Sequence, residues 1–290
     1  MDKKFKIIST QSVASISVTG NFCELSCKHC NKKYLKSMID IKDKEFLNYF
    51  KDKNTALISG GSLKNGSVPF YNHLDLIKKI KENNILLNGH TGYIPEDKFD
   101  QTFIFNSLSI DICGSDKILK EIYNLNLSLK EYQENILKLN EFLINSQKNV
   151  YFDKIEYFNK PAIVPHITIG IYYGKYSFEE EAIDFLKKIK PGKLVLNVLI
   201  PTKNTAFEKI SEIDIKRVLQ VFNYAKNQLP DSLIYLGCMR PFGLFREELD
   251  FLLFEKKIDG IVNPSKKFMK FLESKITDNY IQLKGCCSLL

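Results

Sequence analysis

The chain contains little arginine. Of its 42 basic residues only Arg217, Arg240 and Arg246 are arginine, and the others are lysines. Guanidinium groups are the usual partners of phosphates and base edges. The lysines are scattered as pairs, and no basic run of about 5–8 residues occurs. The formal net charge of +8 therefore does not indicate a nucleic-acid-binding surface, and we expect no nucleic-acid partner.

Long apolar runs are also missing. No stretch approaches the roughly 18 consecutive apolar residues of a membrane-spanning helix, so we expect no membrane partner. The basic start, residues 1–6, is not followed by the apolar segment of about 7–15 residues that a signal peptide needs. We therefore expect a cytoplasmic protein, in which seven cysteines indicate metal or redox chemistry rather than disulfides.

Several familiar catalytic patterns are absent. The sequence has no phosphate-binding loop spacing, and we find no Ser/His/Asp triad. Its four histidines (His29, His73, His90 and His166) lack the spacing of metal ligands. A second CxxC pair, which would make the paired knuckles of many structural zinc sites, is missing too. The chemistry must therefore come from another arrangement of the cysteines.

That arrangement is the segment Cys23-Glu-Leu-Ser-Cys27-Lys-His-Cys30, which follows an apolar run. Three thiolates at this spacing can hold three irons of a [4Fe–4S] cluster, which normally takes four cysteine ligands. The fourth iron is then free to bind a small molecule. The alternatives are a structural zinc site completed by His29 or a distant cysteine, and a chance grouping of thiols.

The CxxxCxxC spacing, with Gly20 and Asn21 before it, resembles the signature of the radical S-adenosylmethionine (SAM) superfamily. The resemblance implies that the open iron binds SAM and that reduction cleaves SAM to a 5′-deoxyadenosyl radical. Residue 29 is often aromatic in that superfamily, so His29 is a mild departure. The segment Lys193–Ser265 is similar to the biotin synthase branch, although the ligands of the auxiliary cluster of biotin synthase itself are missing.

The rest of the chain alternates short apolar runs with segments of helical period, the pattern of repeated βα units. It predicts one α/β domain over residues 1–290, a (β/α)8 TIM-type barrel with a core at about 14–265 and a helix and cysteine-containing tail at 266–290. A partial barrel of six units is the alternative. The segment Gln147–Lys160 fits no unit and is expected to be an insertion or hairpin. The predicted strands are Ala14–Thr19, Thr55–Ser59, Ile85–Asn88, Ser107–Ile112, His166–Ile171, Lys193–Ile200, Leu233–Gly237 and Gly260–Asn263. The predicted helices are Ile41–Asp52, Tyr71–Glu82, Ser128–Ile144, a helix that ends near Ile189, Ile213–Gln228, Leu244–Lys256 and Ser265–Ser274. The patterns Ser128-x-x-Glu131 and Ser177-x-x-Glu180 are typical of capping boxes at the start of a helix.

Active sites of such barrels form at the carboxyl ends of the strands. Asp111 ends the fourth strand, where its carboxylate could bind the SAM ribose or substrate, and His90 could line the interior. The resemblance implies that Arg240 faces the barrel interior with a catalytic role. It also implies a set of SAM contacts, namely Gly60, Gly61, Ser62, Asp111, Gly170, Asn197 and Pro201.

Four cysteines lie outside the loop. Cys113 is expected to be a buried apolar thiol. Cys286 and Cys287, near the end of the sequence, could fold over the barrel mouth and join Cys238 in a second Fe–S cluster, or could be an idle exposed pair.

A second cluster favours sulfur insertion at an unactivated C–H bond, as in lipoyl synthase. A single cluster favours rearrangement or cofactor assembly, and a third interpretation is a non-catalytic zinc or Fe–S protein. The expected partners are a small-molecule or carrier-bound acyl substrate, a ferredoxin- or flavodoxin-type electron donor and a further subunit.

Overall fold

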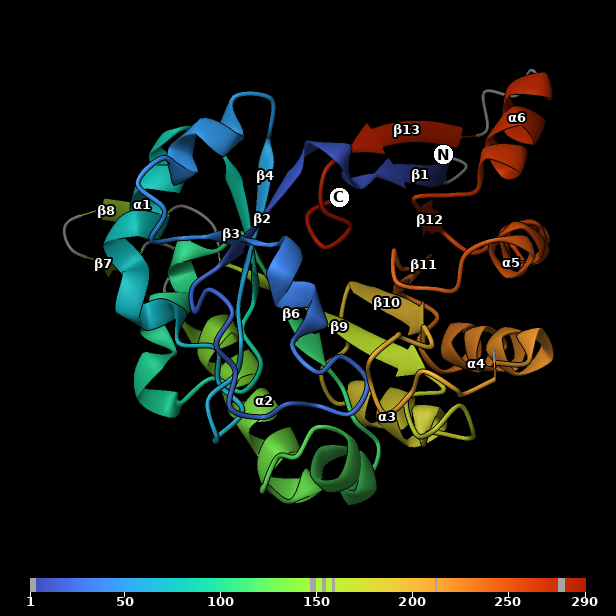
Figure 1. Ribbon diagram of the computed structural model, residues 1–290, viewed down its shortest axis with the longest axis horizontal. Helices are drawn as coiled ribbons and strands as arrows, with labels where there is room; N and C mark the ends of the chain where they lie inside the picture. The colour runs from blue at the N-terminus through green and yellow to red at the C-terminus, as the bar shows by residue number, and fades with distance from the viewer. Residues whose placement is uncertain (1–3, 147–149, 153–154, 158–159, 212, 276–279) are drawn as a thin grey trace.

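A curled parallel sheet of eleven strands forms the centre of the molecule (Figure 1). The computed structural model describes residues 4–290 except 147–149, 153–154, 158–159, 212 and 276–279. The strand order is β13-β1-β12-β11-β10-β9-β6-β5-β4-β2-β3. The bounds of these strands are β1 Phe5–Ser9, β2 Val13–Ser17, β3 Ile39–Asp40, β4 Thr55–Ser59, β5 Leu86–His90, β6 Ser107–Asp111, β9 Ala162–Ile169, β10 Lys193–Val198, β11 Leu233–Leu236, β12 Gly260–Val262 and β13 Tyr280–Lys284.

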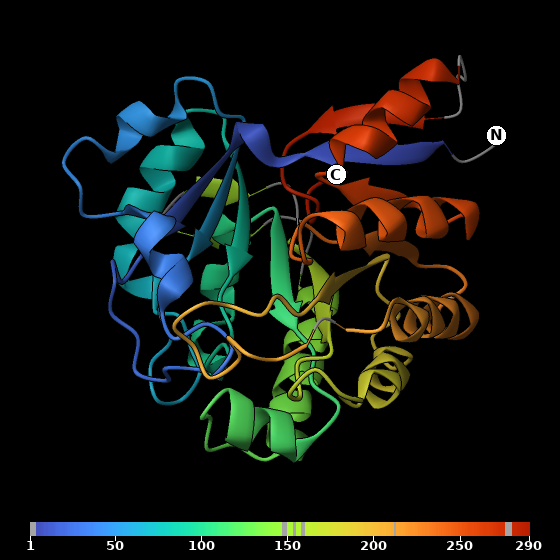
Figure 2. The same ribbon diagram turned by 45° about the vertical axis from the view of Figure 1, so that its right-hand side comes forward.

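The helices cover the outside of the curl, as Figures 1 and 2 show. The α-helices are α1 Leu74–Glu82, α2 Leu129–Asn145, α3 Glu179–Leu186, α4 Ile215–Gln228, α5 Leu244–Glu255 and α6 Lys266–Ser274. Short 3-10 turns lie at Thr10–Ser12, Lys33–Ser37, Phe46–Phe50, Phe70–His73, Glu96–Lys98 and Asp100–Ile104, and a π-helical turn lies at Ile118–Ile122. None of the described helices is long and apolar enough to cross a membrane.

The α/β barrel architecture predicted from the sequence is confirmed, in its open form. Within the described residues the sheet ends at β3 and β13, and these two edges do not pair. All eight predicted strands are present, most of them to within two residues. The exception is β9, which begins at Ala162 rather than His166 and runs through Pro165, a residue that cannot donate a ladder hydrogen bond. The strands β1, β3 and β13 were not predicted.

The inner strands form because their apolar runs are buried on both faces. Strand β4, Thr-Ala-Leu-Ile-Ser, pairs with β2 on one side and β5 on the other. Ala56 and Ile58, on one face of this strand, are completely buried, and Thr55, on the other face, is 1% exposed. This burial on both faces is the reason that such strands are read from sequence as continuous runs rather than as alternating patterns.

The two predicted capping boxes have different outcomes, although both predicted helices form. The box predicted at Ser128 is formed, because its hydroxyl accepts from the Glu131 amide while the Glu131 carboxylate accepts from the Ser128 amide. The similar pattern at Ser177 is not a cap, since α3 begins after Phe178 without a side-chain cap. The helix predicted at 41–52 is also wrong, because only the 3-10 turn Phe46–Phe50 forms there.

The segment 147–160 contains a two-stranded antiparallel hairpin in its described part, which confirms the hairpin expected there. Strand β7 covers Val150–Phe152 and pairs with β8, Ile155–Tyr157. This pair is separate from the main sheet. The hairpin is therefore a small addition between α2 and β9.

Candidate functional site

The cysteine loop follows the carboxyl end of β2. Ligand atoms of Cys27, His29 and Cys30 lie within 4.8 Å of one another, the only such group of three or more metal-binding side chains among the described residues. Cys23 lies outside this group and is buried at 9% exposure, whereas Cys27 and Cys30 are half-buried. The loop thus gathers two of its three thiols closely, with the third beside them in the chain.

Backbone contacts to a distant segment hold the loop in place. The Lys28 amide donates to the Ile122 carbonyl at 2.9 Å, and the Asn124 side-chain amide donates to the Leu25 carbonyl at 2.9 Å. The Cys27 thiol donates to the Tyr123 carbonyl at 3.4 Å. The π-helical turn and the residues after it therefore clamp the loop, a role that no sequence pattern had suggested.

The glycine pair after β4 lies directly against the loop. A β-carbon at Gly61 would come within 1.8 Å of the Phe22 carbonyl oxygen and 2.5 Å of the Cys23 β-carbon. The Gly61 amide donates to the Thr19 hydroxyl at 2.6 Å, and the Glu24 amide donates to the Ser62 carbonyl at 2.8 Å. Only glycine permits this approach. The observed role of Gly61 is to seat the cysteine loop.

The thiols of Cys27 and Cys30 lie close together, and their pKa values are shifted in opposite directions. The hydrogen bond from Cys27 lowers the pKa of Cys30 to about 4 against the opposing effect of burial, with a further contribution from His29. The same hydrogen bond, aided by burial, raises the pKa of Cys27. A thiolate at neutral pH is the form that binds metal.

The donor set fits the predicted cluster. Three cysteines offer thiolate ligands in one loop, and thiolates are the usual protein ligands of [4Fe–4S] clusters. In addition, the His29 Nδ1 atom is buried and has no hydrogen-bond partner in the part of the chain that the structure describes. A buried polar atom without a partner is costly, so the loop as it stands lacks a group that would satisfy it.

Three polar side chains of neighbouring strands meet inside the curl, two of them at strand ends and His166 in the middle of β9. Asp111 at the end of β6 lies 3.3 Å from the His90 Nε2 atom at the end of β5, and their side chains are 38% and 35% exposed. Asp111 is also in register with His166 of β9. The His90 and His166 rings stack with centroids 5.9 Å apart. The interior position suggested for Asp111 and His90 is thus observed, and His166 was missed.

The charges of this trio differ. Burial opposes the charged forms of Asp111 and His90, but their mutual attraction and hydrogen bond outweigh it, lowering the pKa of Asp111 and raising that of His90. Burial instead lowers the pKa of His166 to about 4. These shifts favour an ion pair between Asp111 and His90 beside the neutral form of His166, whose Nδ1 atom lies 3.0 Å from the Val164 carbonyl.

The loops after β9 and β10 contact the cysteine loop and the turn that follows it. Lys28 donates to the Tyr173 hydroxyl at 2.6 Å, in the turn after β9. The hydroxyls of Tyr34 and Thr202 lie 3.4 Å apart, which connects the loop to the segment after β10. These contacts connect the segment after β2, near one edge of the open sheet, to the loops after the central strands β9 and β10.

The remaining predicted SAM contacts have visible structural partners. Gly170 has a φ of +77° and a β-carbon there would meet Ile213 at 2.1 Å, so glycine is required for the turn. The Asn197 side-chain oxygen accepts from the Met239 amide at 3.3 Å. Gly60 lies beside Thr19, and Pro201 is half-buried in the loop after β10. Their contact with SAM stays a prediction.

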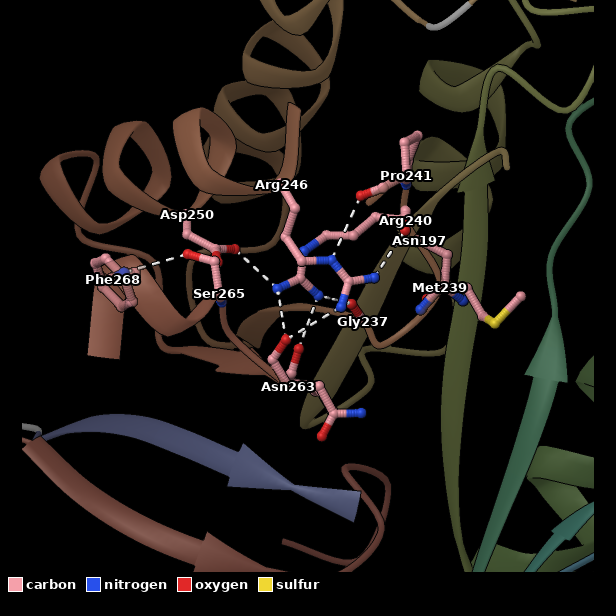
Figure 3. A network of polar contacts seen from close by, with 11 residues as sticks. Asn197, Gly237, Met239, Arg240, Pro241, Arg246, Asp250, Asn263, Ser265 and Phe268 are labelled. Carbon is pink, nitrogen blue, oxygen red and sulfur yellow. Dashed lines mark hydrogen bonds and ion pairs between the residues drawn. The ribbon is translucent and has the colours of Figure 1, made fainter. Parts of the chain in front are cut away.

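Arg240 does not face the interior, which corrects the sequence interpretation (Figure 3). Its side chain is completely buried and donates to the Gly237 and Val262 carbonyls, both at 2.7 Å. It also forms an ion pair with Asp250 at 2.8 Å, and the other Asp250 oxygen accepts from the Ser265 amide. Arg240 therefore ties β11, β12, α5 and the start of α6 together, because a buried guanidinium requires such partners.

The C-terminal cysteines do not fold over the mouth either. Asn88 of β5 donates to the Cys286 thiol at 3.3 Å, and Ser288 lies 2.8 Å from Ser109 of β6. Lys193 donates to the Cys287 carbonyl at 2.8 Å. These partners stand no later than the middle of their strands. The tail thus lies inside the curl, away from the carboxyl edge where the cysteine loop lies.

A second cluster ligated by Cys238, Cys286 and Cys287 remains a prediction. Their sulfur atoms do not form a group within 4.8 Å in the described part of the chain. Cys286 and Cys287 are both buried. The hydrogen bond from Cys287 lowers the pKa of Cys286 to about 6 despite burial, and it raises the pKa of Cys287. Cys113 is buried, as expected.

No family model and no curated protein matches this chain. Among solved structures it is similar to the hydrogenase maturase HydG, with 13% identity and a TM-score of 0.66 for the Carboxydothermus hydrogenoformans protein, over 97% of this chain and 68% of that one. A second HydG structure gives 13% identity and a TM-score of 0.60, over 90% of this chain, which matches only 57% of that chain's length.

Two further similarities show how widely the fold is used. Streptococcus suis SuiB bound to S-adenosylmethionine matches with 13% identity and a TM-score of 0.52, over 95% of this chain and 58% of that one. HMG-CoA lyase from Brucella melitensis matches with 12% identity and a TM-score of 0.51, over 90% and 81%. At these identities the comparisons show the fold alone, so the chemistry must be argued from the site.

Proposed function

We propose that this chain is a radical SAM enzyme, in which Cys23, Cys27 and Cys30 hold a [4Fe–4S] cluster whose fourth iron binds SAM. The observation that carries the proposal is the three-cysteine loop, seated on Gly61 at the carboxyl edge of a curled parallel sheet. Barrel enzymes place their chemistry at that edge. The SAM-bound SuiB structure of similar fold supports the same cofactor.

The bound cluster and SAM would supply a 5′-deoxyadenosyl radical that abstracts hydrogen from a substrate. The chain's own residues would position the reactants and exclude water. We assign SAM contacts to Gly60, Ser62, Gly170, Asn197 and Pro201 at the strand ends. The clamp from Ile122–Asn124 and the contact of Lys28 with Tyr173 would keep the loop rigid around the cluster.

Asp111, His90 and His166 are the groups we assign to a polar part of the substrate or to the SAM ribose. They lie inside the curl on three adjacent strands, and Asp111 and His90 are more than a third exposed. The carboxylate accepts hydrogen bonds, and the neutral His166 can accept or donate one. A substrate with hydroxyl or amino groups suits such a trio better than an entirely apolar one.

Single-cluster chemistry, namely rearrangement or cofactor assembly, is the reaction class that the geometry favours. Sulfur insertion of the lipoyl synthase type would need a second cluster, and Cys286 and Cys287 lie inside the curl, away from the carboxyl edge where the cysteine loop lies. The similarity to a hydrogenase maturase is in keeping with assembly chemistry. A ferredoxin- or flavodoxin-type protein would supply the electron.

A zinc site is the second candidate, and one observation favours it. Cys27, His29 and Cys30 already lie within 4.8 Å of one another, while Cys23 lies outside the group. Mononuclear zinc prefers such mixed nitrogen and sulfur ligands. Against this, the group has three members where a structural zinc site usually has four.

Iron and sulfide analysis with EPR spectroscopy on anaerobically reconstituted protein, with and without SAM, tests these alternatives. About four irons per chain and a signal that changes with SAM are expected for a single radical SAM cluster. About six to eight irons, with one signal insensitive to SAM, would restore sulfur insertion. Zinc in place of iron, without a SAM effect, would refute the enzyme proposal.

A further inference from the structure

His29 occupies a special place in the cysteine loop. It stands between Cys27 and Cys30 in the chain, and its ligand atom lies within 4.8 Å of both thiol sulfurs. Its ring contacts the Tyr123 ring edge-to-face, with centroids 5.4 Å apart. Its Nδ1 atom is buried and has no hydrogen-bond partner within the described residues.

The segment that clamps the loop also restricts the orientation of the His29 ring. Tyr123 belongs to the segment that clamps the loop, because its carbonyl accepts from the Cys27 thiol. Its neighbours Ile122 and Asn124 bind the backbone on either side of Cys27. The imidazole is therefore held against a segment that is itself tied to the loop, so its nitrogen atoms have little freedom to turn toward solvent.

We propose that His29 donates a hydrogen bond from Nδ1 to a sulfur atom of the bound cluster and thereby sets the reduction potential of the cluster. This inference rests on the proposed function. The imidazole is a positioning and tuning residue here, and the iron ligands remain the three cysteines. Nothing in the resemblance assigns this role, since an aromatic hydrocarbon ring at position 29 could not donate such a bond.

The physical reason lies in the charge of the cluster. Reduction adds an electron, and a hydrogen bond to sulfur stabilises the more negative state more than the oxidised one. Such a donor therefore raises the potential and makes reduction easier. Binding would also satisfy a buried nitrogen that otherwise lacks a partner, which is costly in a protein interior.

The test is an EPR-monitored redox titration of the reconstituted full-length protein at one fixed pH. We compare His29→Phe, which keeps a ring of similar size without a donor, with His29→Gln, which keeps an N–H group. For His29→Phe we expect a tenfold fall in the equilibrium constant for one-electron reduction, a shift of about 59 mV to lower potential. His29→Gln should recover part of this shift.

The matched control is His73→Phe, the same substitution in the 3-10 turn Phe70–His73, and it should leave the potential unchanged. An unchanged potential in His29→Phe would overturn the inference while leaving the enzyme proposal intact. Strong coupling of the wild-type signal to a histidine nitrogen in pulsed EPR would also overturn it, because His29 would then be an iron ligand.

Two further outcomes keep the test decisive. If His29→Phe does not take up iron, His29→Leu provides the same removal of the donor, and equal potentials in His29→Leu and wild type would overturn the inference. If the wild-type protein itself holds no four-iron cluster, the proposed function fails, and the inference, which rests on it, fails with it. The iron content of the wild type, measured first, distinguishes the two failures.

Discussion

The molecule has two cysteine-rich segments, and they differ in how their thiols are used. In the loop Cys23–Cys30 the backbone is bound by other segments, while two thiols face each other and a neighbouring imidazole nitrogen has no partner. In the tail Cys286–Leu290 the thiols are buried, and the surrounding polar atoms are paired with Asn88, Ser109 and Lys193. The loop is arranged to receive a ligand, and the tail fills the interior.

The comparison teaches that the number of cysteines is a poor guide to metal binding. Whether the polar atoms around the thiols have hydrogen-bond partners is more informative. Cys287 packs in an apolar cluster with Ile8, Val195 and Tyr235, as a small hydrophobic side chain would. In the cysteine loop, by contrast, the buried Nδ1 atom of His29 beside the thiols has no hydrogen-bond partner among the described residues, which is the state expected of a site that receives a ligand.

The largest expected difference comes from removing one thiol from each segment. Cys27→Ala should abolish cluster incorporation and SAM cleavage, because two thiolates do not hold a [4Fe–4S] cluster. Cys286→Ala should keep about four irons and the SAM-dependent EPR signal. Loss of iron in Cys286→Ala would contradict the distinction between the segments. Global unfolding of Cys27→Ala, measured by circular dichroism, would instead indicate a structural metal site.

A second way to distinguish the cysteine loop from the tail is to disturb the close contact between Gly61 and the loop. Gly61→Ala places a β-carbon 1.8 Å from the Phe22 carbonyl. We expect a loss of about 3 kcal/mol in the free energy of unfolding from overpacking, together with poor iron incorporation. Gly192→Ala is the control, because a β-carbon there has no neighbour within 4 Å. Denaturant unfolding measures the loss of stability, and iron analysis measures cluster incorporation. Equal stability and equal iron content in the two variants would contradict the role of Gly61 in positioning the cysteine loop.

The tail can be disturbed without touching the loop. Asn88 bonds Cys286, Ser107 and Ser109, so Asn88→Ala leaves the buried Ser107 hydroxyl without its partner and should cost about 2 kcal/mol. Iron content per folded chain should stay unchanged. The exposed Asn48→Ala serves as control and should leave the melting temperature unaltered. A loss of iron in Asn88→Ala would show that the tail supports the cluster.

The smallest expected difference is in how the alkylation rates of a thiol in the loop and a thiol outside it depend on pH. Since the pKa of Cys30 is lowered to about 4, Cys30 is a thiolate throughout pH 6 to 8, and its alkylation rate in the metal-free protein should be nearly constant there. Burial raises the pKa of Cys238, so its rate should rise with pH, about tenfold per unit while the thiol form dominates. Mass spectrometry of iodoacetamide-treated protein measures both rates. A steep pH dependence at Cys30 would contradict the lowered pKa of its thiol.

Local patterns predicted much of the fold. Apolar runs such as Thr55–Ser59 correspond to strands because parallel strands are buried on both faces. The capping box at Ser128 predicted α2 because both of its hydrogen bonds form within four consecutive residues. Strand β13 was missed because it lies at an edge, where exposed residues such as Gln282 and Lys284 break the apolar run.

The candidate site was predictable only in part. The spacing of Cys23, Cys27 and Cys30 identified the loop, since the ligands are close in sequence. Arg240 was misassigned because the carboxylate of Asp250 and the carbonyls of β12 become its partners only after folding. No sequence signal marked His166, which is brought beside His90 and Asp111 by the pairing of β6 with β9.

By itself the sequence determined the βα order, the capped helix and the three-cysteine loop, because each depends on interactions between residues near one another in the chain. Only the tertiary structure decided that Gly61 seats the loop, that Asn88 meets Cys286 across 198 positions and that Arg240 is enclosed. Such contacts join distant segments. Their energies depend on which surfaces the fold brings together, and the periodicity of a local segment does not predict which surfaces those are.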